Sequence, residues 1–179
     1  MEAVRHLLPG DAEDYRTLRL EALRLHPEAY GSDAIEESAW TVADFAQRLV
    51  TGSVFGGFPD GTLNAIACLS FPDELRRRPM AILWGVYVRN AYRGSPLAAN
   101  LVNTALEHAQ TKVDHAVLAV TASNQRAIRF YRRLGFDVYA IAPKSLKVSD
   151  GYVDELLMIR SLERRRPYQT VRDRVSCDV

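Results

Sequence analysis

The sequence has very little cysteine. Among its 179 residues only Cys68, inside an apolar segment, and Cys177, near the C-terminus, are cysteines. Two cysteines placed in this way supply neither a disulfide framework nor the ligand spacing of a structural zinc site. The four histidines are also scattered, without the spacing of metal ligands. We therefore expect no bound metal.

The sequence also lacks an excess of charge of either sign. It has 23 lysines and arginines against 22 aspartates and glutamates, a formal net charge of +1. Nonspecific nucleic-acid binding requires a basic surface, so we expect no nucleic-acid partner. No segment approaches the ~20 apolar residues of a membrane span, and the N-terminal segment lacks the apolar core of a signal peptide. These absences predict a cytoplasmic protein without a membrane partner.

What is present is typical of a globular domain. Hydrophobic residues make up 47% and charged residues 25% of the chain, which is long enough to bury one substantial core. After Leu162 the apolar content falls and the sequence becomes ERRRPYQTVRDRVSCDV. We predict one domain over residues 1–162 and a polar, basic tail over residues 163–179.

Apolar periodicity predicts both strands and helices. Strands predominate in the first half and helices are inserted later, which predicts an α/β protein of the α+β type with a mixed sheet covered on both faces. Helices are expected over 11–25, 41–50, 96–111 and 124–135, and strands over 3–7, 53–58, 62–71, 80–88, 115–122, 136–142 and 152–159.

A short polar turn, RGSP, joins the apolar strand over 80–88 to the helix that follows it. Ser95 is a good N-cap and Pro96 suits the first helical position. The N–H groups of Leu97 and Ala98 would then be unpaired at the positive end of the helix dipole, a place that attracts phosphate.

The two residues before the cap fit the same interpretation. Gly94 permits close approach of the backbone to a ligand, and Arg93 adds a positive charge. The alternative is a well-capped turn without any ligand, and the turn alone favours this alternative because short glycine motifs are common.

Longer motifs resemble the GNAT N-acetyltransferase superfamily, in particular its small bacterial-type single-domain members. The segment VRNAYRGSPLAANLV resembles the acyl-CoA pyrophosphate loop, and NQRAIRFYRRLGF resembles the family's second signature, in the same order. LRLEALRLHPEAYGSD resembles the substrate-side helix and loop, and PKSLKVSDGYVDELLMIRSL the closing strand pair. The resemblance implies a mixed, mainly antiparallel sheet that is splayed at its central strands, with helices on both faces.

The resemblance also implies a reaction, the direct attack of an amine on acetyl-CoA as co-substrate. Backbone groups near Val86 and Val88 would pair with the pantetheine arm, and a free N–H at the splay would polarise the thioester carbonyl. The alternative is that these residues only pair with a neighbouring strand. Both can hold if the sheet opens at one end.

The second motif supplies two further candidates. Spacing makes Asn124 an N-cap and Gly135 the residue that ends the helix. The resemblance implies that Asn124 also contacts the cofactor and that Tyr131 is the general acid that protonates the departing CoA thiolate. Because Tyr131 shares a helix face with Ala127 and Leu134, a core tyrosine is the alternative.

The sequence departs from the family pattern in two places. Pro96 stands where the family has its central loop glycine, which removes one phosphate-directed N–H worth about 1 kcal/mol. In addition, residues 81–88 contain no carboxylate or imidazole, so the family's usual general base on the central strand is missing.

Two pairs of carboxylates are candidates for the missing acceptor-side chemistry. Asp154 and Glu155 lie on the last predicted strand, where alternation sends them to opposite faces, and one of them is a candidate base. Glu36 and Glu37 lie in the loop expected to cover the acceptor site, where they would bind a cationic amine. The alternative for the second pair is an ordinary solvated loop.

The leading functional hypothesis is an N-acetyltransferase that acts on a small-molecule or peptide amine, with a homodimer possible. The alternative is a non-catalytic acyl-CoA-binding sensor or interaction module, which Pro96 and the missing base leave open. The identity of the acceptor is not contained in the sequence.

Overall fold

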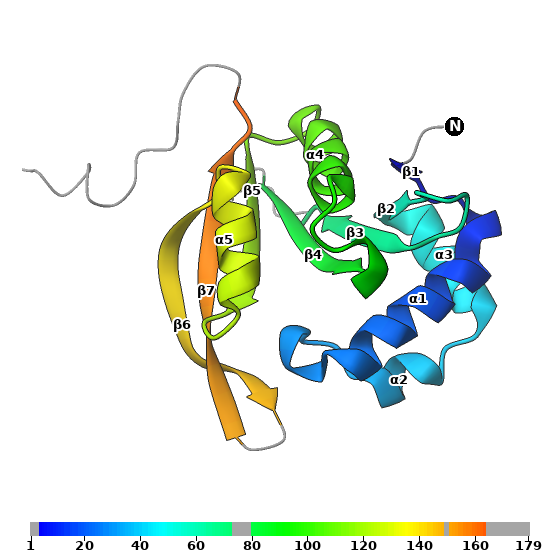
Figure 1. The fold of residues 1–179 in the computed structure, drawn as a ribbon, viewed down its shortest axis with the longest axis horizontal. Helices are drawn as coiled ribbons and strands as arrows, with labels where there is room; N and C mark the ends of the chain where they lie inside the picture. Colours follow the sequence, from blue (N-terminus) through cyan, green and yellow to red (C-terminus); the bar gives the residue numbers. More distant parts are fainter. Residues whose placement is uncertain (1–3, 73–79, 149–150, 164–179) are drawn as a thin grey trace, which may run out of the picture.

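A single seven-stranded sheet organises the computed structural model, which describes residues 4–72, 80–148 and 151–163 (Figure 1). The strand order is β1-β2-β3-β4-β5-β7-β6. Every neighbouring pair is antiparallel except β4 and β5, which are parallel. The predicted mixed, mainly antiparallel sheet is confirmed. Apart from Glu163, the predicted tail lies outside the described residues.

The strands follow the predicted pattern closely. The longest departure is β6, which continues well beyond the predicted residue 142. The strands are β1 (Val4–His6), β2 (Ser53–Gly57), β3 (Ala65–Ser70), β4 (Met80–Val88), β5 (His115–Thr121), β6 (Asp137–Val148) and β7 (Gly151–Ser161).

The helices lie on both faces of the sheet, as predicted. They are α1 (Ala12–Leu25), α2 (Ala34–Ser38), α3 (Val42–Thr51), α4 (Leu97–Gln110) and α5 (Gln125–Arg133), with short 3-10 turns η1 (Pro9–Asp11), η2 (Pro27–Ala29) and η3 (Asn90–Tyr92). The predictions missed α2, which is a single short helix capped by Asp33, whose side chain accepts from the N–H groups of Ile35 and Glu36. Among the described residues, no helix has the length and apolar content to cross a membrane.

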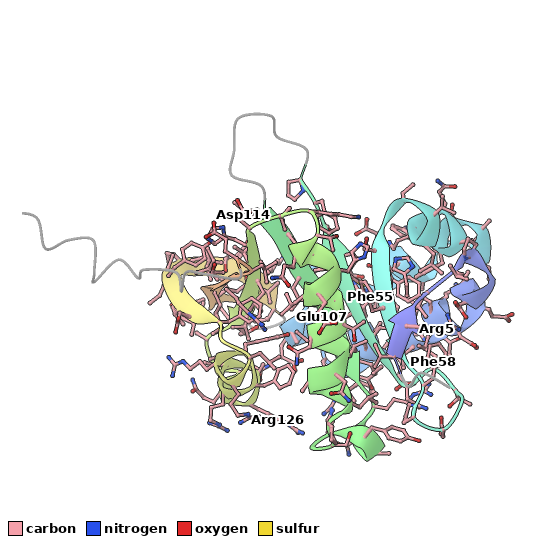
Figure 2. All side chains as sticks on the ribbon, turned by 90° about the horizontal axis from the view of Figure 1, so that it is seen from above. Arg5, Phe55, Phe58, Glu107, Asp114 and Arg126 are labelled. Atoms are coloured by element: carbon pink, nitrogen blue, oxygen red, sulfur yellow. The ribbon has the colours of Figure 1, made fainter. Side chains whose placement is uncertain are left out.

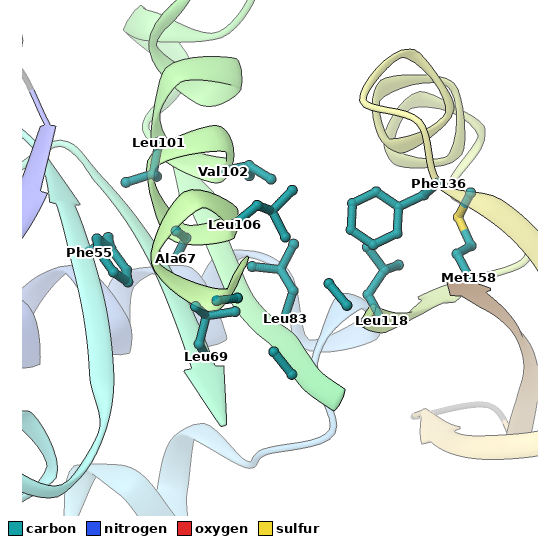
Figure 3. Close-up of a cluster of buried hydrophobic side chains, with 14 of the residues drawn as sticks. Phe55, Ala67, Leu69, Leu83, Leu101, Val102, Leu106, Leu118, Phe136 and Met158 are labelled. Atoms are coloured by element: carbon teal, nitrogen blue, oxygen red, sulfur yellow. The ribbon is translucent and has the colours of Figure 1, made fainter. Parts of the chain in front are cut away.

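Two apolar clusters hold the helices to the sheet. On one face α4 and α5 pack on the central and C-terminal strands, and Figure 3 shows their contributions meeting between helix and sheet. The residues labelled there include Leu101, Val102 and Leu106 of α4, Leu83 of β4, Leu118 of β5, Phe136, and Met158 of β7. On the other face α1 and α3 cover β2, β3 and β4. At the β1 edge Arg5 lies over the Phe58 ring, with 4.3 Å from Cζ to the ring centre (Figure 2).

The sheet opens between its two parallel strands. β4 and β5 pair only from Met80–His115 to Ile82–Val117, and then diverge (Figure 1). We call the region beyond this last pair the splay. A bulge lies in it, because the β3–β4 register shifts between Ile66 and Cys68 and Gly85 takes a φ of 62°. A single glycine inside a strand is the usual sign of such a bulge.

Candidate active site

The splay exposes one backbone edge of β4. Arg89 donates its N–H to the Asn64 carbonyl beside β3, so the alternating groups of Val86 and Val88 point to the opposite edge. The Val86 carbonyl accepts from the Tyr30 hydroxyl at 3.0 Å and the Val88 carbonyl from Arg93 Nε at 2.9 Å. The backbone predicted to pair with pantetheine therefore lies at the open edge, with side chains as its present partners.

A short segment of the chain bridges the splay. The Thr121 hydroxyl of β5 donates to the Glu28 carbonyl at 2.9 Å, while Tyr30 holds Val86 of β4. Thr121 and Val86 each lie four residues beyond the last β4–β5 pair. Residues 28–30 therefore span the opening from one strand to the other, a role for Tyr30 that no sequence pattern indicated.

The RGSP turn begins α4 one residue later than predicted. The helix starts at Leu97, and Pro96 is its N-cap with helical angles of −63° and −14°. The Ser95 hydroxyl donates to the Tyr92 carbonyl at 2.7 Å and accepts from the Leu97 N–H at 3.3 Å. The prediction that the Leu97 N–H is unpaired is therefore wrong, because it donates to the Ser95 hydroxyl. The Ala98 N–H, in the first helical turn, has no intrahelical acceptor.

Gly94 and Arg93 precede this turn in different settings. Gly94 has a φ of 88°, and an added Cβ would have no atom within 4 Å. Arg93 turns back toward the splay, where its Nη2 lies 2.8 Å from Nε2 of His26. Since a guanidinium only donates, His26 Nε2 is the acceptor. Arg93 therefore lies at the mouth of the splay and not in the outer part of the turn.

The second motif forms the predicted cap and places a tyrosine beside the splay. Asn124 Oδ1 accepts from the Ala127 N–H at 3.0 Å, which confirms its N-cap role, and Gly135 follows α5 with a φ of 80°. Tyr131 packs edge-on against the Phe136 ring, 5.9 Å between centres. Burial, and secondarily the Tyr30 phenol, raise the pKa of Tyr131 well above its usual range. Its hydroxyl therefore keeps its proton at neutral pH.

The four arginines of α5 lie on the exposed side of the helix, away from the ring contacts of Tyr131. All four are exposed, and Figure 2 shows Arg126 at the outer side of the helix. The exposed set comprises Arg126, Arg129, Arg132 and Arg133.

Asp154 and Glu155 both bind the irregular part of β6. Asp154 is exposed and its Oδ1 accepts from the Lys144 N–H at 2.8 Å. Glu155 Oε2 accepts from the Ser145 hydroxyl at 2.9 Å, and Glu155 lies directly opposite Thr121 in the β5–β7 ladder. Of the two carboxylates, Glu155 is therefore the one beside the β5 wall of the splay.

The prediction that Glu36 and Glu37 lie in a loop is wrong, because both belong to α2. Glu36 is exposed, but Glu37 is 3% exposed. Its carboxylate accepts from Arg19 Nε and Nη2 at 3.0 and 2.9 Å and from Arg48 Nη1 at 3.2 Å. Burial raises the pKa of Glu37, but the hydrogen bonds and charges of Arg19 and Arg48 outweigh it and hold the pKa below its usual value. Both oxygens are thus engaged by arginines, which leaves no geometry for direct contact with an amine.

Comparison with known proteins places this geometry in a family. The family model described as Acetyltransferase (GNAT) family matches residues 14–136. The chain belongs to the GNAT acetyltransferase family. The matched range contains the splay, the RGSP turn and α5, so the resemblance based on the two motifs is confirmed.

Curated GNAT relatives are distant and longer. A mycothiol acetyltransferase from Mycobacterium sp. (strain MCS) is 29% identical over 153 aligned residues, and the match covers 79% of this chain and 47% of that protein. An uncharacterized N-acetyltransferase from Methanocaldococcus jannaschii is 25% identical over 136 residues, 75% of this chain and 60% of that protein. The chain spans about half the length of the mycothiol acetyltransferases that it matches.

Solved structures share the GNAT fold. A GNAT acetyltransferase from Streptococcus pneumoniae superposes with a TM-score of 0.79 at 20% identity, covering 89% of this chain and 98% of that one. A putative acetyltransferase, yncA, from Salmonella typhimurium with its cofactor acetyl-CoA gives 0.74 at 20% identity, covering 93% and 96%. These likenesses confirm the predicted fold class.

Proposed function

We propose that the protein is an N-acetyltransferase that transfers an acetyl group from acetyl-CoA to a small-molecule or peptide amine in the cytoplasm. The observation that carries the proposal is the open backbone edge at Val86 and Val88, which leads to the RGSP turn at the start of α4. Membership of the GNAT family supports it, since such enzymes use acetyl-CoA, as the Salmonella relative does.

The described residues offer partners for two parts of this co-substrate, the pantetheine arm and the pyrophosphate. Pantetheine N–H groups match the carbonyl groups of Val86 and Val88, where they would replace the Tyr30 hydroxyl and Arg93 Nε as donors, and a pantetheine carbonyl matches the Val88 N–H. The pyrophosphate matches Gly94, which leaves open space, and the Ala98 N–H at the positive end of α4. Asn124, the N-cap of α5, stays a predicted contact of the cofactor.

The chemistry needs one bond formed and one broken. The neutral amine attacks the thioester carbonyl carbon, so that a C–N bond forms and the C–S bond breaks. The Val86 N–H stabilises the negative charge on the carbonyl oxygen. Tyr131 donates its proton to the departing sulfur, and the second nitrogen proton leaves through water to Glu155. The products are an acetamide and the CoA thiol, and Tyr131 regains its proton from solvent.

Release of free thiol tests this proposal. The protein is incubated with acetyl-CoA and a panel of alkylamines, amino acids and peptides, and CoA thiol is measured with and without each amine. Amine-dependent thiol release is the expected result. Tight binding of acetyl-CoA without thiol release for any amine would instead indicate an acyl-CoA-binding module. The possible homodimer is a separate prediction, which sedimentation of the free protein measures.

A further inference from the structure

Three charged side chains from three helices form a buried cluster under the sheet. Arg19 of α1 and Glu37 of α2 make a two-contact ion pair whose side chains are 1% and 4% exposed. Arg48 of α3 reaches the same carboxylate at 3.2 Å and is 20% exposed. We call these residues the Arg19–Glu37–Arg48 triad. Two positive charges and one negative charge leave the triad with a net charge of +1.

The triad lies directly beneath the bulge of β4. Arg19 Nη1 is 3.5 Å from the point where a Cβ on Gly85 would lie, and its Cζ is 5.3 Å from the centre of the Tyr30 ring. Arg19 Nη1 is buried and has no hydrogen-bond partner among the described residues. The side of the triad that faces Gly85, next to the Val86 backbone, therefore carries a buried cationic N–H group without a hydrogen-bond partner.

Neutral groups surround the triad on the other sides. Burial raises the pKa of the Cys68 thiol to about 11, and it raises the pKa of Tyr15 and Tyr30 well above the usual range, so none of these groups carries charge at neutral pH. Other titratable groups near the splay belong to different elements. They are Tyr131 of α5, Glu155 of β7, Tyr87 of β4, Glu28 of η2 and its N-cap His26, Arg93 of the turn, and the ion pair of Glu21 with Arg89.

We propose that the Arg19–Glu37–Arg48 triad keeps the acceptor amine neutral once it is bound beside the bulge. This inference rests on the proposed function, which places the attacked carbonyl at Val86. A fixed positive charge nearby disfavours the ammonium form, so the bound amine gives up its proton to water more readily than the free amine does. A strong base on β4 is then unnecessary, which accounts for the lack of a carboxylate or imidazole over 81–88. The three residues position charge and do not touch the reacting atoms.

Two substitutions change the triad charge in opposite directions. Glu37→Gln raises it to +2, and Arg48→Met lowers it to zero while filling the space beside Trp40. The readout is the single-turnover acetyl-transfer rate at saturating alkylamine as a function of pH, because this rate reports protonation in the enzyme–substrate complex. We expect its acidic limb to move down by about half to one pH unit in Glu37→Gln and up by a similar amount in Arg48→Met.

Three controls separate charge from structural damage. Arg48→Lys retains the charge, so the acidic limb of its pH–rate profile should lie at the same pH as in the parent protein. The acidic limb of kcat/KM should lie at the pKa of the free amine in every variant, because kcat/KM reports the protonation of the unbound reactants. With an arylamine, which is already neutral at pH 7, the transfer rate near neutral pH should be the same in both charge variants as in the parent protein. Thermal unfolding shows that each variant is folded before its rates are compared.

The outcomes distinguish the inference from the function on which it rests. Limbs that stay in place, or that move in the same direction in both charge variants, overturn the role of the triad while acetyl transfer stands. Limbs that move apart as expected support it. A parent protein that transfers acetyl to no amine overturns the proposed function and the triad inference together.

Discussion

At the scale of single residues, a substitution of Tyr131 distinguishes a role in acid catalysis from a role in packing. Tyr131→Phe keeps the ring contacts with Phe136, so we expect little change in unfolding free energy or in acetyl-CoA affinity. Loss of the proton donor should lower turnover by about 10² or more, the usual contribution of a positioned acid. Steady-state kinetics, calorimetric titration and urea unfolding of the two proteins measure these three quantities.

The leaving group supplies the control for Tyr131. With an acyl donor whose thiolate is a better leaving group, less protonation is needed and the loss in Tyr131→Phe should shrink. A variant that turns over like the parent with both donors would assign the tyrosine to packing alone.

The backbone conformation of Gly94 restricts which residue can stand there, although its surroundings are open. Because φ is 88°, any side chain at this position costs about 1–2 kcal/mol of stability even though no neighbouring atom would be struck. Gly94→Ala should therefore lower the unfolding free energy by that amount and also weaken acetyl-CoA binding. Gly61, which also has a positive φ and open space, is the matched control: Gly61→Ala should show the loss of stability with unchanged affinity. Equal affinities in the two variants would remove Gly94 from the phosphate site.

Glu155 and Asp154 form a second matched pair at this scale. Glu155→Gln should lower turnover at least about tenfold if the carboxylate receives the amine's proton. Asp154→Asn keeps an oxygen for the Lys144 N–H and should leave turnover unchanged. Rates at saturating acetyl-CoA and amine compare the two variants. Equal activity of both would leave water as the proton acceptor.

At the scale of elements, the segment 28–30 occupies the open edge of β4 through the hydrogen bond of Tyr30 to Val86. Tyr30→Phe frees the Val86 carbonyl for a pantetheine N–H, so acetyl-CoA affinity should rise by up to about fivefold, the value of one hydrogen bond. Thr121→Val removes the other attachment of the segment and leaves Val86 unchanged, so the affinity should stay constant. Calorimetric titration decides; lower affinity in Tyr30→Phe would mean that the hydroxyl assists binding.

Local patterns predicted most elements because their signals lie close together in the sequence. Thr41 with Asp44 forms the capping box that starts α3, and Asn124 with Gly135 brackets α5. The splay itself came from the resemblance to the GNAT family. Strand pairing between β4 and β5 joins residues far apart in the chain, and no local pattern specifies where it stops.

The missed features all depend on contacts between distant segments. α2 has five residues, too few for a periodic signal, so Glu37 was expected in a loop. The Glu37 carboxylate can be buried because it pairs with Arg19 and Arg48, which come from two other helices. The hydrogen bond of Tyr30 to Val86 likewise spans 56 positions. The candidate site was therefore predictable where it is built from one motif, and not where three helices converge.

At the scale of the whole molecule, stability should fall in acid through the Glu21–Arg89 pair. The hydrogen bond from Arg89 holds the pKa of Glu21 below its ordinary 4.5, with burial opposing and Tyr87 assisting. A carboxyl whose folded pKa is lowered stabilises the protein above the unfolded value and loses this contribution as pH falls through the folded one. Unfolding free energy should therefore decline below about pH 4.5.

Glu21→Gln isolates this contribution. The variant should be less stable than the parent at pH 7 and should lose less stability between pH 5 and pH 3, because one titrating carboxyl has been removed. Urea unfolding at a series of pH values measures both slopes. Parallel slopes would assign the acid sensitivity to other groups, such as Asp11 beside Arg5, whose hydrogen bond also lowers the pKa of that carboxyl.

Acetyl transfer to an amine can be followed with a labelled acetyl group. The protein is mixed with acetyl-CoA that carries ¹³C in the acetyl carbonyl and with the amine that releases thiol fastest, and the amide product is followed by NMR. We expect a labelled acetamide to appear in step with CoA thiol. In Tyr131→Phe the labelled acetamide should form more slowly by a factor of about 10² or more, while labelled acetyl-CoA should still bind. Thiol released without labelled amide, or labelled acetyl-CoA bound and unchanged, would contradict the proposed function.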